Sequence, residues 1–146
     1  MSIIKHEVIR AGKPTGFAGG VAVLGAKGFV FLSGCTGIDE KTGITPLELK
    51  TQVQNTWGKI IERLEGFGSS VENICHAWTY VVGSFPNGIN NDPKAEVISK
   101  TRREVWEEHY GAEIAEKLII AGTLIGVTAL ARPEMLVEIQ VIAAIE

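Results

Sequence analysis

The run LVEIQVIAAI at residues 136–145 constrains this chain more than any other stretch of its sequence. Every odd position is apolar, whereas the even positions carry Glu138 and Gln140 among aliphatic neighbours. A two-residue period is that of a β-strand with one face on a core. Because burying an unpaired carboxylate is costly, Glu138 is expected to face water, a partner or a ligand. Two interpretations of Glu138 stay open: an edge-strand charge that prevents aggregation, or a functional carboxylate.

The length and composition of the chain indicate one globular domain over residues 1–146, large enough to bury a stable core without disulfide bonds or structural metal ions. A formal net charge of −3 provides no basic surface for nucleic acid, and no apolar run reaches membrane-spanning length. Cys35 and Cys75 are too few for a disulfide framework, so a reducing, cytoplasmic setting is expected. The three histidines show no metal-ligand spacing, so we expect no metal site.

The N-terminal part of the chain predicts strands separated by glycine-rich turns. Residues 3–10 alternate loosely and are expected to form a first strand, whereas residues 11–20, rich in glycine, are expected to form a loop. Apolar runs at residues 21–24 and 29–32 flank the sequence Gly-Ala-Lys-Gly at residues 25–28. This arrangement is typical of a β-hairpin.

Two amphipathic helices are predicted. Thr45 and Pro46 have the residue types of an N-cap and a first helical residue, and a capping box completes the start signal. The apolar stripe that follows, which includes Trp57, recurs at helical spacing and is expected to pack on the sheet. Asp92 and Pro93 predict the start of a second helix, which runs to about residue 110.

The run ICHAWTYVV at residues 74–82 predicts a strand whose alternation places His76, Trp78 and Tyr80 on one face. A sheet with helices on one side must cover its second face, and self-association is the simplest way to do so. His76 is therefore either an interface histidine or a ligand contact. Residues 123–130 and 136–145 are expected to pair as a final hairpin around a proline-containing turn.

Three stretches resemble the RidA/YjgF family of small trimeric proteins, which includes enamine and imine deaminases. They are GFVFLSGCTGIDEKTG at residues 28–43, REVWEEHYG at residues 103–111 and the C-terminal residues 122–145. The resemblance implies an α+β fold, similar to chorismate mutase, with a mixed β-sheet of about six strands and two helices packed on one face. It also implies a homotrimer formed through the other face, and no cofactor.

In deaminating relatives, a glutamate in the last strand positions the attacking water, and Glu138 takes this place. The position of the arginine that binds the substrate carboxylate falls on or beside Gly122, and that of the tyrosine that closes the pocket falls in residues 17–20, where only Phe17 is aromatic. The register of the second helix places Arg103 where relatives have a pocket-lining asparagine, so Arg103 is the expected substitute for the missing arginine. The alternative is that Arg103 pairs with Glu107 on the helix surface.

The expected site therefore combines Glu138 as the catalytic residue with these substrate-binding residues: Gly34, Cys35, His76, Trp78, Arg103 and Thr123. Cys35 stands where the family usually has glutamine, and it is either a packed thiol or a nucleophile.

Two functions are compatible with this pattern. One is a RidA-type hydrolase or deaminase that acts on a small enamine or imine at an inter-subunit cleft, with altered specificity. The other is a non-catalytic trimer that binds a small metabolite or a protein partner. Ribonuclease activity, also attached to this family, is disfavoured by the negative net charge.

Overall fold

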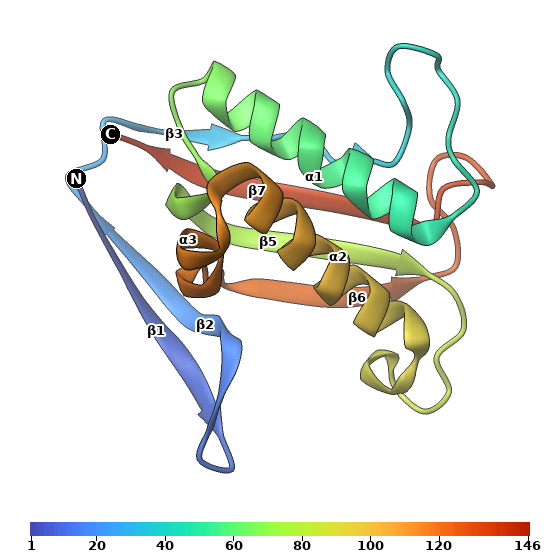
Figure 1. Cartoon of the computed structure of the whole chain (residues 1–146), viewed down its shortest axis with the longest axis horizontal. Coiled ribbons are helices and arrows are strands. Elements are labelled where there is room, and N and C mark those ends of the chain that lie inside the picture. Colours follow the sequence, from blue (N-terminus) through green and yellow to red (C-terminus); the bar gives the residue numbers. More distant parts are fainter.

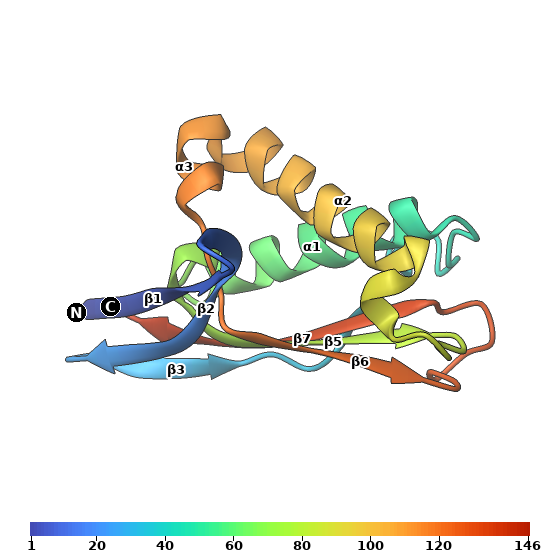
Figure 2. The ribbon, with the colours of Figure 1, turned by 90° about the horizontal axis from the view of Figure 1, so that it is seen from below.

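The computed structural model describes residues 1–146 as an α+β fold in which helices cover one face of a mixed sheet (Figures 1 and 2). The strands are β1 (Ser2–Arg10), β2 (Lys13–Leu24), β3 (Gly28–Phe31), β4 (Cys35–Thr36), β5 (Ile74–Val82), β6 (Gly122–Val127) and β7 (Val137–Ile145). The helices are α1 (Leu49–Gly66), α2 (Pro93–Tyr110) and α3 (Ala112–Lys117), with short 3-10 turns η1 (Val71–Asn73) and η2 (Ile89–Asn91). None of the helices is long and apolar enough to span a membrane.

The main sheet has the order β3-β7-β5-β6, and β4 also pairs with β7. β7 is antiparallel to β3 and β5, whereas β5 and β6 are parallel. The predicted hairpin of β6 and β7 is therefore wrong, because β5 lies between them. Residues 128–136 connect the two strands, and this segment is long enough to cross the end of β5.

The first two strands form a separate hairpin that extends away from the main sheet (Figure 1). They pair from Ser2 opposite Leu24 to Arg10 opposite Lys13. The glycine-rich residues predicted as a loop thus lie mostly within β2, and β2 pairs with β1 instead of β3. The hairpin predicted around residues 25–28 is wrong for the same reason.

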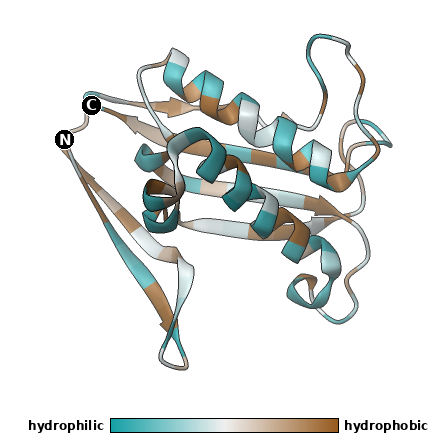
Figure 3. Ribbon diagram, viewed as in Figure 1, coloured by the Kyte–Doolittle hydropathy of each residue, from teal (hydrophilic) through white to brown (hydrophobic).

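The core lies between the sheet and the helix layer, as predicted. Trp57 of α1 is 1% exposed and meets Trp106 of α2 edge to face, with ring centroids 5.2 Å apart. The odd positions of β7 from Val137 to Ala143 are also buried. Hydrophilic residues predominate on the outer sides of the helices (Figure 3). The buried residues of α1 are mostly hydrophobic and belong to the core.

The predicted start of α1 is wrong. The helix begins at Leu49 after Glu48, which makes no side-chain cap, and the Thr45 hydroxyl is buried without a hydrogen-bond partner. The preceding loop is instead held by Gln52, whose Nε2 donates to Pro46 O at 2.7 Å. Pro46 thus lies in the loop before the helix.

The start of α2 is confirmed. The Asp92 carboxylate accepts a hydrogen bond from Lys94 N at 2.9 Å, and Pro93 occupies the first helical position. α3 forms in the connector after Gly111.

Candidate functional site

The sheet face opposite the helices is not covered by any helix (Figure 2). The strand pairing places polar and aromatic side chains on this face. This outer face is defined by neighbouring residues of the two central strands, which pair as His76 with Ile142, Trp78 with Gln140 and Tyr80 with Glu138. The edge strand β3 adds Phe29 and Phe31, which are 49% and 73% exposed. Such a patch is typical of an interaction surface.

Glu138 lies on this outer face because its neighbours Val137 and Ile139 point into the core. Its carboxyl group lies against the backbone of Gly34, where a Cβ atom would be only 2.7 Å from Glu138 Cδ and 2.9 Å from its Oε1. Gly34 therefore leaves the space that the carboxylate occupies. Glu138 takes part in no ion pair within the chain, so its charge is available to a ligand or a partner.

Cys35 does not lie beside Glu138. It pairs with Ile139 and is 1% exposed, with its thiol on the helix side of the sheet. Arg63 Nη1 donates to Cys35 Sγ at 3.2 Å, but burial outweighs this contact and raises the pKa of the thiol. The structure thus places Cys35 in the core, where a protonated thiol packs without access to a substrate.

Three of the expected site residues gather at the beginning of β6. His76 Nε2 lies 3.2 Å from Thr123 Oγ1, and the His76 and Trp78 rings are 4.2 Å apart. Partial burial lowers the pKa of His76, which favours its neutral form at pH 7. This cluster shares the outer face with Glu138, because Trp78 and Tyr80 lie on the same side of β5.

Arg103 is not near Glu138. It is exposed on α2, on the other side of the sheet, and its Nη2 lies 3.8 Å from the position of a Cβ at Gly16 in the β1–β2 hairpin. It forms no ion pair with Glu107 either. The expected surface pair with Glu107 is therefore absent, whereas a role of Arg103 in a cleft between subunits stays a prediction.

The neighbouring Arg102, and not Arg103, lines a cavity of about 350 Å³ enclosed by the β1–β2 hairpin, α2 and the start of β6. The cavity walls include Arg10, Phe17, Ser99, Arg102, Gly122 and Thr123. A signal was present in the sequence: Arg102 and Trp106 are four residues apart on a helix, and the guanidinium lies 4.9 Å from the ring centroid.

Gly122, where the resemblance implies an arginine, lines the same cavity. A Cβ at Gly122 would lie 3.0 Å from Ala77 O, so any side chain there would crowd the backbone of β5. The cavity thus receives its arginine from α2 instead of from the start of β6.

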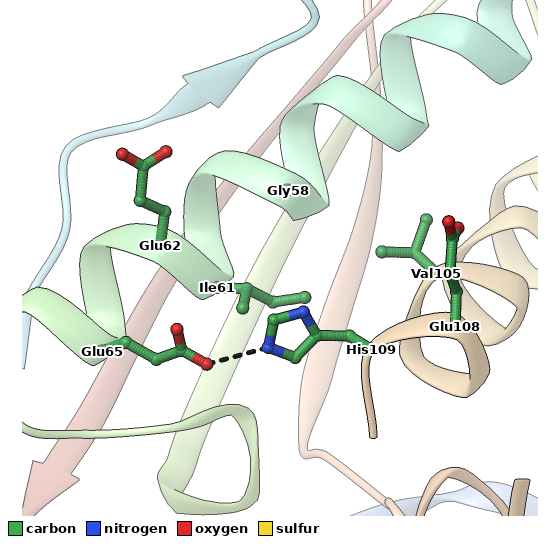
Figure 4. A pocket seen from close by; sticks show the side chains of 7 residues that line it. All are labelled: Gly58, Ile61, Glu62, Glu65, Val105, Glu108 and His109. Atoms are coloured by element: carbon green, nitrogen blue, oxygen red, sulfur yellow. Dashed lines mark hydrogen bonds and ion pairs between the residues drawn. The ribbon is translucent and has the colours of Figure 1, made fainter. Parts of the chain in front are cut away.

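A second pocket, of about 400 Å³, lies between α1 and α2 (Figure 4). Its polar side chains are Glu62, Glu65, Glu108 and His109, and His109 Nε2 is 2.9 Å from Glu65 Oε1. No group of His, Cys, Asp and Glu side chains in the chain has the arrangement needed to hold a metal ion. The glutamates border solvent on the helix surface, and this pocket is far in the fold from Glu138.

Comparisons with known proteins agree with this architecture. The family model described as endoribonuclease L-PSP matches residues 13–145, and the comparison with curated proteins found no match. The chain is similar in structure to YyfB from Yersinia pestis, a protein of unknown function of the conserved Rid family, with 24% sequence identity and a TM-score of 0.72. That match covers 99% of this chain and 100% of YyfB.

Two structures from E. coli show the same fold. TdcF with bound serine is 19% identical, with a TM-score of 0.65, over 89% of this chain and 88% of TdcF. The YjgF gene product is 20% identical, with a TM-score of 0.62, over 88% of this chain and 87% of that protein. Because the family model spans nearly the whole chain, the protein belongs to the endoribonuclease L-PSP family, that is, the RidA/YjgF family.

Proposed function

We propose that this protein is a RidA-type hydrolase that deaminates a small enamine or imine metabolite in a cleft between the subunits of a homotrimer. The observation that carries the proposal is the free carboxylate of Glu138 on the outer face, seated over Gly34. A carboxylate at this place can orient a water molecule and accept its proton.

The proposed reaction is hydrolysis of a C=N bond. Glu138 takes a proton from a water molecule as the water oxygen adds to the imine carbon. The proton then passes from Glu138 to the nitrogen of the substrate. Collapse of the resulting carbinolamine forms the carbonyl product and releases ammonia. An enamine substrate first takes a proton on carbon to become the imine. No cofactor enters this sequence.

The geometry of one chain supports a site shared between subunits. Glu138 projects from the outer face, whereas the Arg102 cavity opens on the helix side of β6. Thr123 is common to both regions, because it lines the cavity and its hydroxyl contacts His76 on the outer face. A second copy that packs on the outer face would cover the exposed Phe29 and Phe31, and in the proposed trimer the cavity of one copy would face Glu138 of another.

A non-catalytic ligand-binding trimer is the second candidate. It is favoured by Gly122 and Phe17, which replace the arginine and tyrosine of deaminating relatives. The structure of E. coli TdcF with bound serine is compatible with either function, because it shows that a protein of this fold holds a small amino acid. Endoribonuclease activity, although part of the family description, has little support from a chain of net charge −3.

The test is ammonia release from freshly generated imino acids by wild-type protein and Glu138→Gln. We expect turnover that falls by about 100-fold or more in the variant, as for loss of a general base. Glu107→Gln, an exposed change on α2, is the matched control and should retain full activity. No ammonia release by wild-type protein from any of the imines would favour the binding function. Light scattering should report three times the chain mass of 15.7 kDa, and a monomer would contradict the shared cleft.

A further inference from the structure

The cavity between α2 and the β1–β2 hairpin carries positive charge without a counterion. Arg10 and Arg102 both line it, and none of its 14 lining residues is acidic. Neither arginine forms an ion pair, and Arg102 Nε is buried without a hydrogen-bond partner. Buried charges are normally paired, so the unpaired guanidinium of Arg102 indicates an anionic ligand. Arg10 is exposed at the wall of the cavity and can add a second cationic contact.

Both guanidinium groups are held in place by aromatic rings. Arg102 lies over Trp106, which is buried in the core, and Arg10 lies 5.3 Å from the ring centroid of Phe17. Stacking of this kind orients the planar donor fork of an arginine while leaving its N–H groups free. Burial and the nearby charge of Arg103 lower the pKa of Arg102 to about 10, so it remains charged at neutral pH.

The hairpin wall of the cavity is fixed to the rest of the domain. Lys5 Nζ donates to Glu72 O at 2.8 Å and to Ile119 O at 3.0 Å. Ala18 N donates to Ile120 O at 3.0 Å, directly beside Phe17. These contacts tie β1 and β2 to the segment that leads into β6, and they set the hairpin that carries Arg10 against the cavity.

We infer that this cavity binds a small organic dianion, with one anionic group at Arg102 and the other at Arg10. Arg10 and Arg102 carry two positive charges, and a single monoanion would neutralise only one of them. Two anionic groups neutralise both. Arg103, at the neighbouring position on α2, adds to the positive potential. Hydroxyl and amide groups on the walls, such as those of Thr79 and Asn90, can complete the hydrogen bonding of the ligand.

The anion site can also be assigned a substrate class, and this part of the inference rests on the proposed function. The substrate would then be an imine or enamine with two anionic groups, and the neighbouring subunit's carboxylate would act at its C=N carbon. The anion site itself stands on the geometry of one chain. Binding is therefore measured separately from turnover.

The test is calorimetric titration of the full-length protein with succinate, butyrate and inorganic phosphate at pH 8 in low-chloride buffer. Succinate should bind at least about tenfold tighter than butyrate, since only the dianion engages both arginines. Arg102→Gln should weaken succinate binding by about tenfold or more, and Arg10→Gln should remove most of the preference for succinate over butyrate. Arg132→Gln, which lies outside the cavity, is the control and should bind as wild type.

Each outcome bears on the site. Phosphate that binds tighter than succinate, with the same dependence on Arg102, would support the site and identify a phosphoryl group as the anion. Equal affinity for succinate and butyrate, or undiminished succinate binding by both arginine variants, would overturn it. Far-UV circular dichroism checks that Arg102→Gln is folded, and Arg10→Gln on the exposed hairpin provides an independent variant. Glu138→Gln should bind succinate normally, so failure of turnover alone leaves the anion site intact.

Discussion

Gly34 and Gly37 flank β4, and replacing each by alanine should affect a different property. We expect Gly34→Ala to lower activity and Gly37→Ala to lower stability. At Gly34 the new Cβ would meet the carboxyl end of Glu138 at 2.7 Å, and that end of a flexible side chain can move. At Gly37 it would meet Gln52 Cβ at 2.4 Å and Cα at 2.5 Å, which belong to the start of α1. Neither glycine has a positive φ, so alanine causes no backbone strain at either position.

The cost at Gly37 follows from what Gln52 holds together. Its Nε2 donates to Pro46 O and to Glu134 O at 2.9 Å, and its Oε1 accepts from Leu136 N at 2.9 Å. Overpacking costs about 1–3 kcal/mol, and each lost hydrogen bond about 1 kcal/mol. We therefore expect Gly37→Ala to lower the free energy of unfolding by about 3 kcal/mol.

At Gly34 the balance is different. Alanine reduces the conformational freedom of the unfolded chain, which stabilises by about 0.4–1 kcal/mol and offsets the small cost of moving Glu138. The free energy of unfolding should therefore stay within about 1 kcal/mol of wild type. The carboxylate must nevertheless shift by about 1 Å, and a displacement of this size can lower a catalytic rate about 100-fold.

Urea unfolding followed by circular dichroism measures the stabilities. All variants are compared at one fixed chain concentration, because the stability of any self-associating protein depends on it. Ammonia release measures the activity. A Gly37→Ala protein as stable as wild type would refute the packing argument at Gln52. A Gly34→Ala protein with full deaminase activity would refute the view that Gly34 positions the catalytic carboxylate.

Two further predictions concern stability. Trp57→Ala should lower the free energy of unfolding by about 3–5 kcal/mol. Trp57→Phe should lower it much less, because the buried indole N–H has no hydrogen-bond partner to lose. Equal losses for the two variants in calorimetric unfolding would contradict this. Asp92→Ala should cost about 1 kcal/mol through loss of its bond to Lys94 N, whereas Thr45→Val should cost nothing, since the Thr45 hydroxyl is buried and unpartnered. Urea unfolding measures both variants. A Thr45→Val protein less stable than Asp92→Ala would contradict this expectation and support Thr45 as the N-cap of α1.

Local periodicity predicted which way side chains point, but it did not predict which strands are neighbours. The buried odd positions of β7 and the outward His76, Trp78 and Tyr80 of β5 follow from alternation within one strand. The insertion of β5 between β6 and β7 depends on contacts distant in the sequence. A register shift between Ile74 and His76 also moved Cys75 off the core face, where strict alternation places it.

Glycine misled the reading of β2 for a physical reason. A glycine-rich segment without strong β-formers is typical of a loop. In the structure, Gly19 lies where a Cβ would be 3.0 Å from Val8 Cγ2, so the absence of a side chain lets β2 lie close against β1. Glycine has a low intrinsic preference for strands, but here it permits β2 to pair closely with β1.

The candidate site shows how far one residue of helical register matters. Successive helix positions differ in direction by about 100°, so Arg102 points into the cavity while Arg103 lies exposed near Gly16. The sequence-based prediction selected Arg103 for a pocket, whereas the cavity in the structure is lined by Arg102. The spacing of Arg102 to Trp106 distinguishes them, because a guanidinium stacked on a core aromatic ring is drawn toward the interior. The relation between Arg102 and Glu138 is of another kind. They lie on opposite sides of one sheet, so the proposed function requires Arg102 of one copy and Glu138 of another to meet at the same ligand.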